Sequence, residues 1–218
     1  MKLAGKTETL VQCDFDGTIT EEDISFLILD AFANGDWRRR LDEYREGKIS
    51  VGRFNTQAFS MVKEDKQTLD RFVLKVARIR AGFGELLSYC QQKDFRFVIV
   101  SNGLTFYIKT ILESLGISNV EIFAAQAKFS PSGIKARYLG PDGSQLQDGF
   151  KEAYIRHFLK SGYHIIYAGN GASDFPSARL ADHIFATGQL LEHCQGMSVS
   201  CTPFTDLNDV IRGLDRLA

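Results

Sequence analysis

Two aspartates one residue apart, Asp14 and Asp16, follow the apolar run Thr9–Cys13 and precede Gly17. The run predicts a buried strand that ends in a tight turn. Two carboxylates this close repel each other, so they need a cation or a shared proton. Mg²⁺ prefers hard oxygen ligands and keeps several waters, so it can bridge the Asp14 carboxylate, the Asp16 backbone carbonyl and a phosphate oxygen. The plain alternative is an Asp-Gly turn without chemistry.

Polar residues also follow two further predicted strands. Phe95–Val100 leads into Ser101–Gly103, and His164–Ala168 leads into Gly169–Asp174. Ligands of open parallel sheets bind beyond the carboxyl ends of the strands, so we expect these clusters to lie beside Asp14. A helical pattern follows each strand, and strands that alternate with helices predict an α/β fold with a doubly wound parallel sheet.

With Lys151 at the start of a predicted helix, these clusters resemble, in order and separation, the four motifs of the haloacid-dehalogenase-like phosphatase superfamily. The resemblance covers nearly the whole chain. It implies a Rossmann-like core, Mg²⁺ as the cofactor and hydrolysis of a phosphomonoester. It also implies that Asp14 is the nucleophile that forms an aspartyl-phosphate, and that Asp16 protonates the leaving oxygen and then activates water.

We expect the substrate phosphate at the tip of the second strand. The Ser101 hydroxyl and the backbone N–H groups of Asn102 and Gly103 can hydrogen-bond phosphate oxygens, although Ser101 alone is equally typical of strand-end capping. Lys151 is similar to the third-motif lysine of the family, which neutralises charge on the nucleophile and on the transferring phosphoryl group. Two other lysines compete for this role, Lys135 and Lys160.

The fourth cluster departs from the family pattern at one position. Most relatives carry an aspartate that ligates magnesium where this chain has Asn170. Asparagine offers a carbonyl oxygen but no charge, so the site should hold Mg²⁺ less tightly. The predicted metal ligands are Asp14, Asp16, Asn170 and Asp174. Asp174 is expected in the outer shell or as a substitute ligand, or else as a helix N-terminal residue that interacts with the dipole.

Residues 21–80 show several successive helical periods and no convincing strand. We therefore predict a small helical cap domain at 21–80, inserted into a core domain made of 1–20 and 81–218. Turn signals within Ile122–Asp148 predict a small antiparallel hairpin. Asp206–Leu214 predicts a closing helix.

The predicted cap resembles that of the phosphoserine-phosphatase-like branch of the superfamily. Within it, Asp14–Thr20 followed by Asp23, together with Arg78–Phe83 and Ala186–Cys194, is most similar to the methionine-salvage phosphatases. Those enzymes act on 2-hydroxy-3-keto-5-methylthiopentenyl-1-phosphate. Two alternatives stay open. One is a phosphoserine phosphatase, and the other is a catalytically weakened family member that binds a phosphorylated ligand, which Asn170 motivates.

Several charged and aromatic residues of the predicted cap have two interpretations. A phosphoserine enzyme requires a cation for the substrate carboxylate, but such charge runs are more often a solvated helix face. The arginines in question are Arg38, Arg39, Arg40, Arg45 and Arg53. Phe54, Phe59 and Trp37 favour the core of the cap over the substrate wall. Asp23 either faces the substrate or caps a helix.

The composition narrows the class of partner. A formal net charge of −1 supplies no basic field for nucleic acid or for a membrane surface, so we expect a small-molecule substrate. The family resemblance implies that this substrate is a small phosphorylated metabolite. The four cysteines lack the paired spacing of a zinc site, and the apolar runs are too short to span a bilayer. Met1–Thr9 has no signal-peptide core, so we expect a cytoplasmic protein. We expect it to be a monomer or a homodimer.

Two other enzyme classes are disfavoured. Asp16 and Lys151 suit phosphoryl chemistry rather than a dehalogenase. A dinucleotide-binding dehydrogenase requires a glycine fingerprint in the first strand–helix turn, where this chain has Asp14–Thr18.

Overall fold

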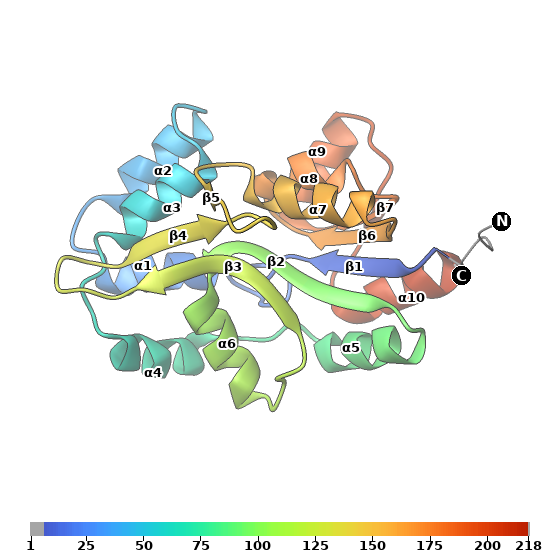
Figure 1. The fold of residues 1–218 in the computed structure, drawn as a ribbon, viewed down its shortest axis with the longest axis horizontal. Coiled ribbons are helices and arrows are strands. Elements are labelled where there is room, and N and C mark those ends of the chain that lie inside the picture. Colours follow the sequence, from blue (N-terminus) through green and yellow to red (C-terminus); the bar gives the residue numbers. More distant parts are fainter. Residues whose placement is uncertain (1–6, 218) are drawn as a thin grey trace.

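The structure, a computed structural model, describes residues 7–217 and contains one sheet with the strand order β5-β4-β3-β2-β1-β6-β7-β8 (Figure 1). The strands are β1 (Thr9–Cys13), β2 (Arg96–Leu104), β3 (Glu121–Lys128), β4 (Lys135–Leu139), β5 (Gln145–Leu146), β6 (His164–Gly169), β7 (His183–Ala186) and β8 (Thr202–Pro203). From β3 to β8 in this order every neighbouring pair is parallel, whereas β4 and β5 extend the sheet antiparallel. The predicted α/β fold with a parallel doubly wound core is confirmed.

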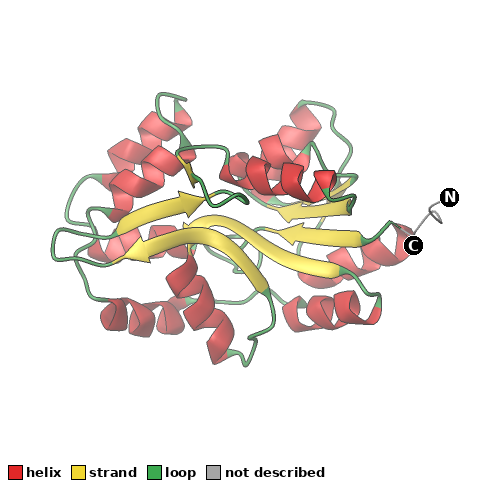
Figure 2. Ribbon diagram, viewed as in Figure 1, coloured by secondary structure: helices red, strands yellow, loops and turns green. Residues whose placement is uncertain are grey.

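Helices cover both faces of the sheet (Figure 2). They are α1 (Ile24–Phe32), α2 (Trp37–Arg45), α3 (Val51–Phe59), α4 (Lys66–Val76), α5 (Phe83–Gln92), α6 (Thr105–Ser114), α7 (Phe150–Lys160), α8 (Phe175–Ala178), α9 (Gly188–Gly196) and α10 (Leu207–Leu217). In Figure 1, α7, α8 and α9 lie on one face, and α5, α6 and α10 lie on the other. Strands β1, β2 and β6 are covered by helices on both faces. Each strand therefore contains a run of mainly apolar residues.

The position of β1 in the middle of the sheet places the site. β1 pairs with β2 through Val11 and Phe97, and with β6 through Val11 and Ile166. All three strands run in the same direction, so the residues that follow them meet at one edge of the sheet. The strands predicted at Thr9–Cys13, Phe95–Val100 and His164–Ala168 are therefore confirmed within a few residues.

Helices α1 to α4 follow β1 directly and form the segment predicted as a cap. Each begins after an N-cap side chain that accepts a backbone hydrogen bond, and these residues are Asp23, Asp36, Ser50 and Asp65. The segment is also tied to the rest of the molecule, because α4 packs on α6 and Thr110 Oγ1 donates to Asp70 Oδ1 at 2.9 Å. The division into 1–20 with 81–218 and 21–80 stays a prediction. Residues 1–6 and 218 of that core domain lie outside the described part of the chain.

The sequence interpretation missed two strands, β7 and β8, and described Ile122–Asp148 only as a small antiparallel hairpin. The pattern at Ile122–Asp148 is more than a flap, because β3 pairs parallel with β2 and antiparallel with β4. The short strands β7 and β8 were not predicted, since four-residue and two-residue segments carry too little periodicity to be recognised. Within residues 7–217, no helix combines the length and the apolar character that a membrane crossing requires.

Candidate active site

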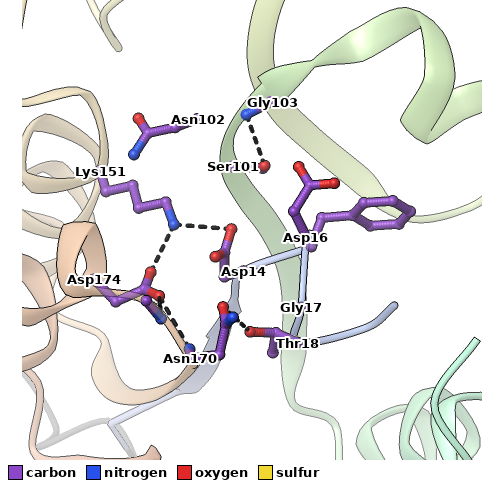
Figure 3. Close-up of polar contacts among 12 residues, drawn as sticks. Asp14, Asp16, Gly17, Thr18, Ser101, Asn102, Gly103, Lys151, Asn170 and Asp174 are labelled. Atoms are coloured by element: carbon purple, nitrogen blue, oxygen red, sulfur yellow. Dashed lines mark hydrogen bonds and ion pairs between the residues drawn. The ribbon is translucent and has the colours of Figure 1, made fainter. Parts of the chain in front are cut away.

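The predicted clusters meet in one cavity of about 590 Å³ at the carboxyl ends of β1, β2 and β6. One wall is polar and holds Asp14, Asp16, Ser101, Asn102, Gly103, Lys151 and Asn170. Figure 3 shows these side chains converging, with the Lys151 ammonium between Asp14 and Asp174. The opposite wall comes from α1, α2 and α3, and α9 contributes Gln189, Glu192 and His193. The sheet topology thus gathers residues that are far apart in the sequence.

Lys151 is the buried cation of the site. Its ammonium lies 2.8 Å from Asp14 Oδ1 and 2.6 Å from Asp174 Oδ1, and the residue is only 1% exposed. It stands at the second position of α7, on the face that packs against the sheet. The rival lysines Lys135 and Lys160 are exposed, so neither serves this cavity.

Asp174 is fully buried and its carboxylate is completely engaged. Besides Lys151, Oδ1 accepts from the Tyr167 hydroxyl at 2.6 Å. Oδ2 accepts from the backbone N–H groups of Asn170 at 3.0 Å and Gly171 at 2.8 Å. Burial raises the Asp174 pKa, but Lys151 and these donors outweigh it, so the pKa is lowered overall. These contacts favour an outer, positioning role for Asp174 over direct metal ligation.

Asp14 is held very differently from Asp174. Burial and the nearby Asp174 charge raise its pKa to about 7, although Lys151 pulls it down. The Lys151 ammonium lies 2.8 Å from Asp14 Oδ1, and no other donor in the described part of the chain bonds to that oxygen. The Lys151 ammonium is shared by two buried carboxylates, Asp14 and Asp174. Of the two, Asp174 has the larger set of additional hydrogen-bond donors. Asp14 is therefore the carboxylate that still needs positive charge nearby.

Asp16 points away from Asp14, toward Gly103 (Figure 3). Its Oδ1 accepts from the backbone N–H of Ile24 at 3.0 Å, and its Oδ2 accepts from the Tyr107 hydroxyl at 2.5 Å. Burial and the Asp23 charge raise the Asp16 pKa to about 8 against these two donors. A carboxyl group with that pKa holds its proton at neutral pH, which is what a general acid requires.

Residues Ser101–Gly103, which lie near the end of β2, are anchored by side chains of α3 and β4. The Asn102 carbonyl accepts from Asn55 Nδ2 at 2.9 Å and from the Tyr138 hydroxyl at 2.5 Å. In a trans peptide the N–H points opposite to the C=O, so this anchoring directs the Gly103 N–H inward, where it donates to Ser101 Oγ at 2.9 Å. The Gly103 amide is thus already used, and the Ser101 hydroxyl is left with its own hydrogen to donate.

The donor set fits a weak magnesium site. The Asp14 carboxylate, the Asp16 backbone carbonyl and the Asn170 amide oxygen are all hard oxygen ligands. Asn170 Oδ1 accepts from Thr18 Oγ1 at 3.0 Å and keeps a second lone pair. Among residues 7–217, however, no group of three or more His, Cys, Asp or Glu side chains is arranged around one ion. Amide and carbonyl oxygens, together with the Asp14 carboxylate, would have to hold the ion.

Two supporting residues were not assigned a role from the sequence. Arg80 donates through Nε to the Thr18 carbonyl and through Nη2 to the Gly17 carbonyl, both at 2.8 Å, and so fixes the turn after Asp14. Tyr167 holds Asp174 from within β6. A tyrosine in an otherwise apolar strand is a signal that could have found it, because a buried phenol needs a partner.

Comparison with known proteins identifies the family. A sequence profile described as haloacid dehalogenase-like hydrolase matches residues 11–179, so the chain belongs to the haloacid dehalogenase-like hydrolase family. Two relatives carry the name 2-hydroxy-3-keto-5-methylthiopentenyl-1-phosphate phosphatase. The one from Geobacillus thermodenitrificans (strain NG80-2) is 31% identical over 97% of this chain and 98% of its own length. The one from Exiguobacterium sp. (strain ATCC BAA-1283 / AT1b) is 33% identical over 93% and 95%.

Solved structures agree on the fold. A phospho-aspartyl intermediate analogue of phosphoserine phosphatase superposes with a TM-score of 0.69 at 17% identity, and covers 95% of this chain and 99% of its own. A substrate-bound phosphoserine phosphatase complex gives the same TM-score at 18% identity, and covers 95% and 98%. The solved structures therefore support the α/β fold. The family profile and the relatives confirm the predicted superfamily, so the chain is an enzyme of the hydrolase class.

Replacing Lys151 by methionine should destabilise the protein by about 3 to 5 kcal/mol, because two buried carboxylates lose their cation. Both carboxyl groups would then have raised pKa values in the folded state and would bind more protons than in the unfolded state. The loss in the free energy of unfolding of Lys151→Met, relative to the wild type, should therefore become smaller as the pH falls from 8 toward 5. Urea unfolding at both pH values measures this, with Lys160→Met on the exposed end of α7 as the control. Equal stabilities of the two variants would contradict the buried ion-pair role.

Proposed function

We propose that this protein is a Mg²⁺-dependent phosphomonoesterase that works through an aspartyl-phosphate on Asp14. The observation that carries the proposal is the shared ammonium of Lys151, 2.8 Å from Asp14 and 2.6 Å from Asp174. Asp174 is fully bonded, so Asp14 is the buried carboxylate free to react. The family profile and the names of the relatives support the same class of reaction.

The residues divide the reaction between them. An Asp14 oxygen attacks phosphorus, and the bond from phosphorus to the leaving oxygen breaks while Asp16 gives that oxygen its proton. Asp16, now a carboxylate, takes a proton from the water that attacks the aspartyl-phosphate, and inorganic phosphate leaves. Lys151 balances the negative charge on the nucleophile and the phosphoryl group, and the Ser101 hydroxyl donates to a phosphoryl oxygen. Mg²⁺, held by Asp14, Asn170 and the Asp16 carbonyl, would supply further positive charge to the phosphate.

Hydrolysis of p-nitrophenyl phosphate should require Mg²⁺, stop on addition of EDTA and return when Mg²⁺ is restored. Asp14→Asn should lower kcat by at least about 10³-fold, because the amide is a poor nucleophile. Its melting temperature should not fall, since the substitution removes a buried charge whose pKa is already raised to about 7. Release of p-nitrophenolate and thermal melting measure the two effects. Turnover retained in Asp14→Asn would remove this residue as the nucleophile.

The cavity wall opposite the phosphate site supports a substrate with an apolar tail. It is formed mainly by apolar and aromatic side chains of α1, α2 and α3, namely Phe26, Leu41, Tyr44, Val51 and Phe54. Phe54 lines the cavity and, at 2% exposed, also packs in the buried core as predicted. Trp37 and Phe59 lie in the buried core as predicted. We propose 2-hydroxy-3-keto-5-methylthiopentenyl-1-phosphate as the substrate, in line with the names of the relatives.

Phosphoserine is the competing small substrate and would need a cation and an anion on this wall. Of the five cap arginines only Arg45 lines the cavity, and it is exposed with its guanidinium 3.7 Å from Asp42. Arg38 and Arg40 instead pair with Asp30 and Glu43. Asp23 also lines the cavity, but its Oδ1 caps α1 by accepting from Phe26 N at 2.9 Å. The wall thus offers more apolar surface than paired charge.

The methylthio substrate should be hydrolysed with a higher kcat/KM than O-phosphoserine. Removing the methylthio group from the substrate should cost roughly 10- to 200-fold in kcat/KM, since each apolar group fitted to such a wall is worth about 1 to 3 kcal/mol. Phe54→Ala should weaken this discrimination, whereas Arg39→Ala on the exposed face of α2 serves as the control. Steady-state phosphate release on the three substrates provides the measurement. A preference for O-phosphoserine that Arg45→Ala abolishes would favour the competing substrate.

Asn170 supports a second candidate, a family member that binds a phosphorylated ligand with little turnover. The neutral amide at this position leaves one fewer charge beside Asp14 than an aspartate would. The Asn170 side chain lies against Gly17, where a Cβ would approach Nδ2 to 2.2 Å, so the residue is closely fitted to the turn.

Asn170→Asp should increase Mg²⁺ affinity by roughly tenfold, because it adds a charge to a site of hard oxygens. Titration calorimetry with Mg²⁺ measures this, and Asn208→Asp on α10 is the matched control. A wild-type protein that turns over phosphomonoesters readily would favour the enzyme. An inactive wild type that gains activity from this one change would favour the weakened binder.

A further inference from the structure

Tyr107 is a fully buried residue of α6 that no motif singled out. Its exposed fraction is 0%, and its hydroxyl group lies between two polar side chains from other segments. It donates to Asp16 Oδ2 at 2.5 Å and lies 2.8 Å from the Ser25 hydroxyl of α1. The phenol thereby joins the helix after the phosphate loop to the aspartate turn and to the first helix of the predicted cap.

The direction of these hydrogen bonds follows from the single hydrogen on a phenol. Because Tyr107 donates that hydrogen to Asp16, its oxygen can only accept from Ser25. The donors therefore run in one direction, from Ser25 to Tyr107 to Asp16. Each hydrogen bond polarises the next, so the bond to Asp16 is strengthened by the one behind it.

Gly103 leaves the space that this arrangement needs. A Cβ at position 103 would lie 1.8 Å from the Tyr107 hydroxyl oxygen and 2.5 Å from Asp16 Oδ2. Any side chain there would separate the two groups. The absence of a side chain at Gly103 thus admits the Tyr107 hydroxyl to the Asp16 carboxyl group.

Two donors from residues 7–217 bond to the Asp16 carboxyl group, and they approach different oxygens. Ile24 N fixes Oδ1 and Tyr107 fixes Oδ2, so together they set both the position and the rotation of the carboxyl plane. Each oxygen keeps a further lone-pair direction for the proton that is transferred. With the hydroxyl removed, one fixed point would remain and the plane could rotate about it.

We propose that Tyr107 is a positioning residue for Asp16, which orients its carboxyl group for both proton transfers of the reaction. The proposal rests on the proposed function. In the first transfer Asp16 gives its proton to the leaving oxygen as the bond from that oxygen to phosphorus breaks. In the second transfer, the attacking water forms a bond to phosphorus and gives a proton to the Asp16 carboxylate, while the bond from phosphorus to the Asp14 oxygen breaks. Inorganic phosphate then leaves, and Asp14 is again a carboxylate.

The two transfers can be separated by the leaving group of the substrate. p-Nitrophenolate leaves without needing a proton, so only the second transfer depends on Asp16 with this substrate. An alkyl phosphate such as ethyl phosphate depends on both transfers. A residue that merely supports the fold would affect the two substrates equally.

The experiment compares Tyr107→Phe with the wild type on both substrates in the presence of Mg²⁺. With ethyl phosphate, kcat/KM should fall by about 10- to 100-fold, as expected for a mispositioned general acid. With p-nitrophenyl phosphate, kcat/KM should stay within about twofold while kcat and KM fall together. Stopped-flow mixing should then show a burst approaching one p-nitrophenolate per enzyme, because the aspartyl-phosphate accumulates.

Tyr89→Phe is the matched control, because the Tyr89 hydroxyl also donates to a carboxylate, Asp215 Oδ1 at 2.8 Å, but between α5 and α10. Thermal melting shows whether each variant is folded. Should Tyr107→Phe not fold, Ser25→Ala removes the other hydroxyl of the chain of donors and should shift the same quantities in the same direction by a smaller factor.

Uniform losses on both substrates without a burst would overturn the positioning role, as would unchanged kinetics on both. A wild-type protein that hydrolyses neither substrate would instead overturn the proposed function, and this role with it. If the wild type is active and Tyr107→Phe is unaffected, the proposed phosphatase function is retained and only the positioning role of Tyr107 is rejected.

Discussion

The arrangement of this site depends on one ammonium group enclosed between two buried carboxylates. Lys151, Asp14 and Asp174 are exposed by 1%, 6% and 0%, so all three have given up most of their hydration. A buried ion pair of this kind seldom stabilises a protein more than apolar residues of the same volume would. Its value here is chemical, because it keeps Asp14 ionisable in a cavity from which much of the water is excluded.

The two carboxylates are distinguished by their hydrogen bonds rather than by their distance from the cation. Asp174 has a tyrosine hydroxyl and two backbone N–H groups, whereas Asp14 has no comparable donors. The pKa is accordingly lowered at Asp174 and raised to about 7 at Asp14. A similar division applies to Asp16, where burial raises the pKa to about 8. Environment thus gives three aspartates three different affinities for a proton.

The segment between β1 and α5 affects the site in two ways. Its helices α1 to α3 form the apolar wall that faces the phosphate-binding residues. Its buried polar residues also reach the reacting groups, since Asn55 fixes the Asn102 carbonyl and Ser25 contacts Tyr107. The apolar wall and the hydrogen bonds to Asn102 and Tyr107 therefore depend on the same helices. Any movement of this segment would change the phosphate loop as well as the wall.

The parallel core, the order of the site clusters and the Asp14–Asp16 pair could all be predicted from the amino-acid sequence. These are local signals, because an apolar run followed at once by polar residues marks a buried strand and the edge where it ends. The short strands β7 and β8 escaped because their periodicity is too brief. Only the tertiary structure decided that Lys151 is the buried lysine, that Asp174 binds this lysine, and that Phe54 lines the cavity. These contacts depend on which side chains are buried together. Distances across the folded sheet determine this, whereas spacing along the chain does not.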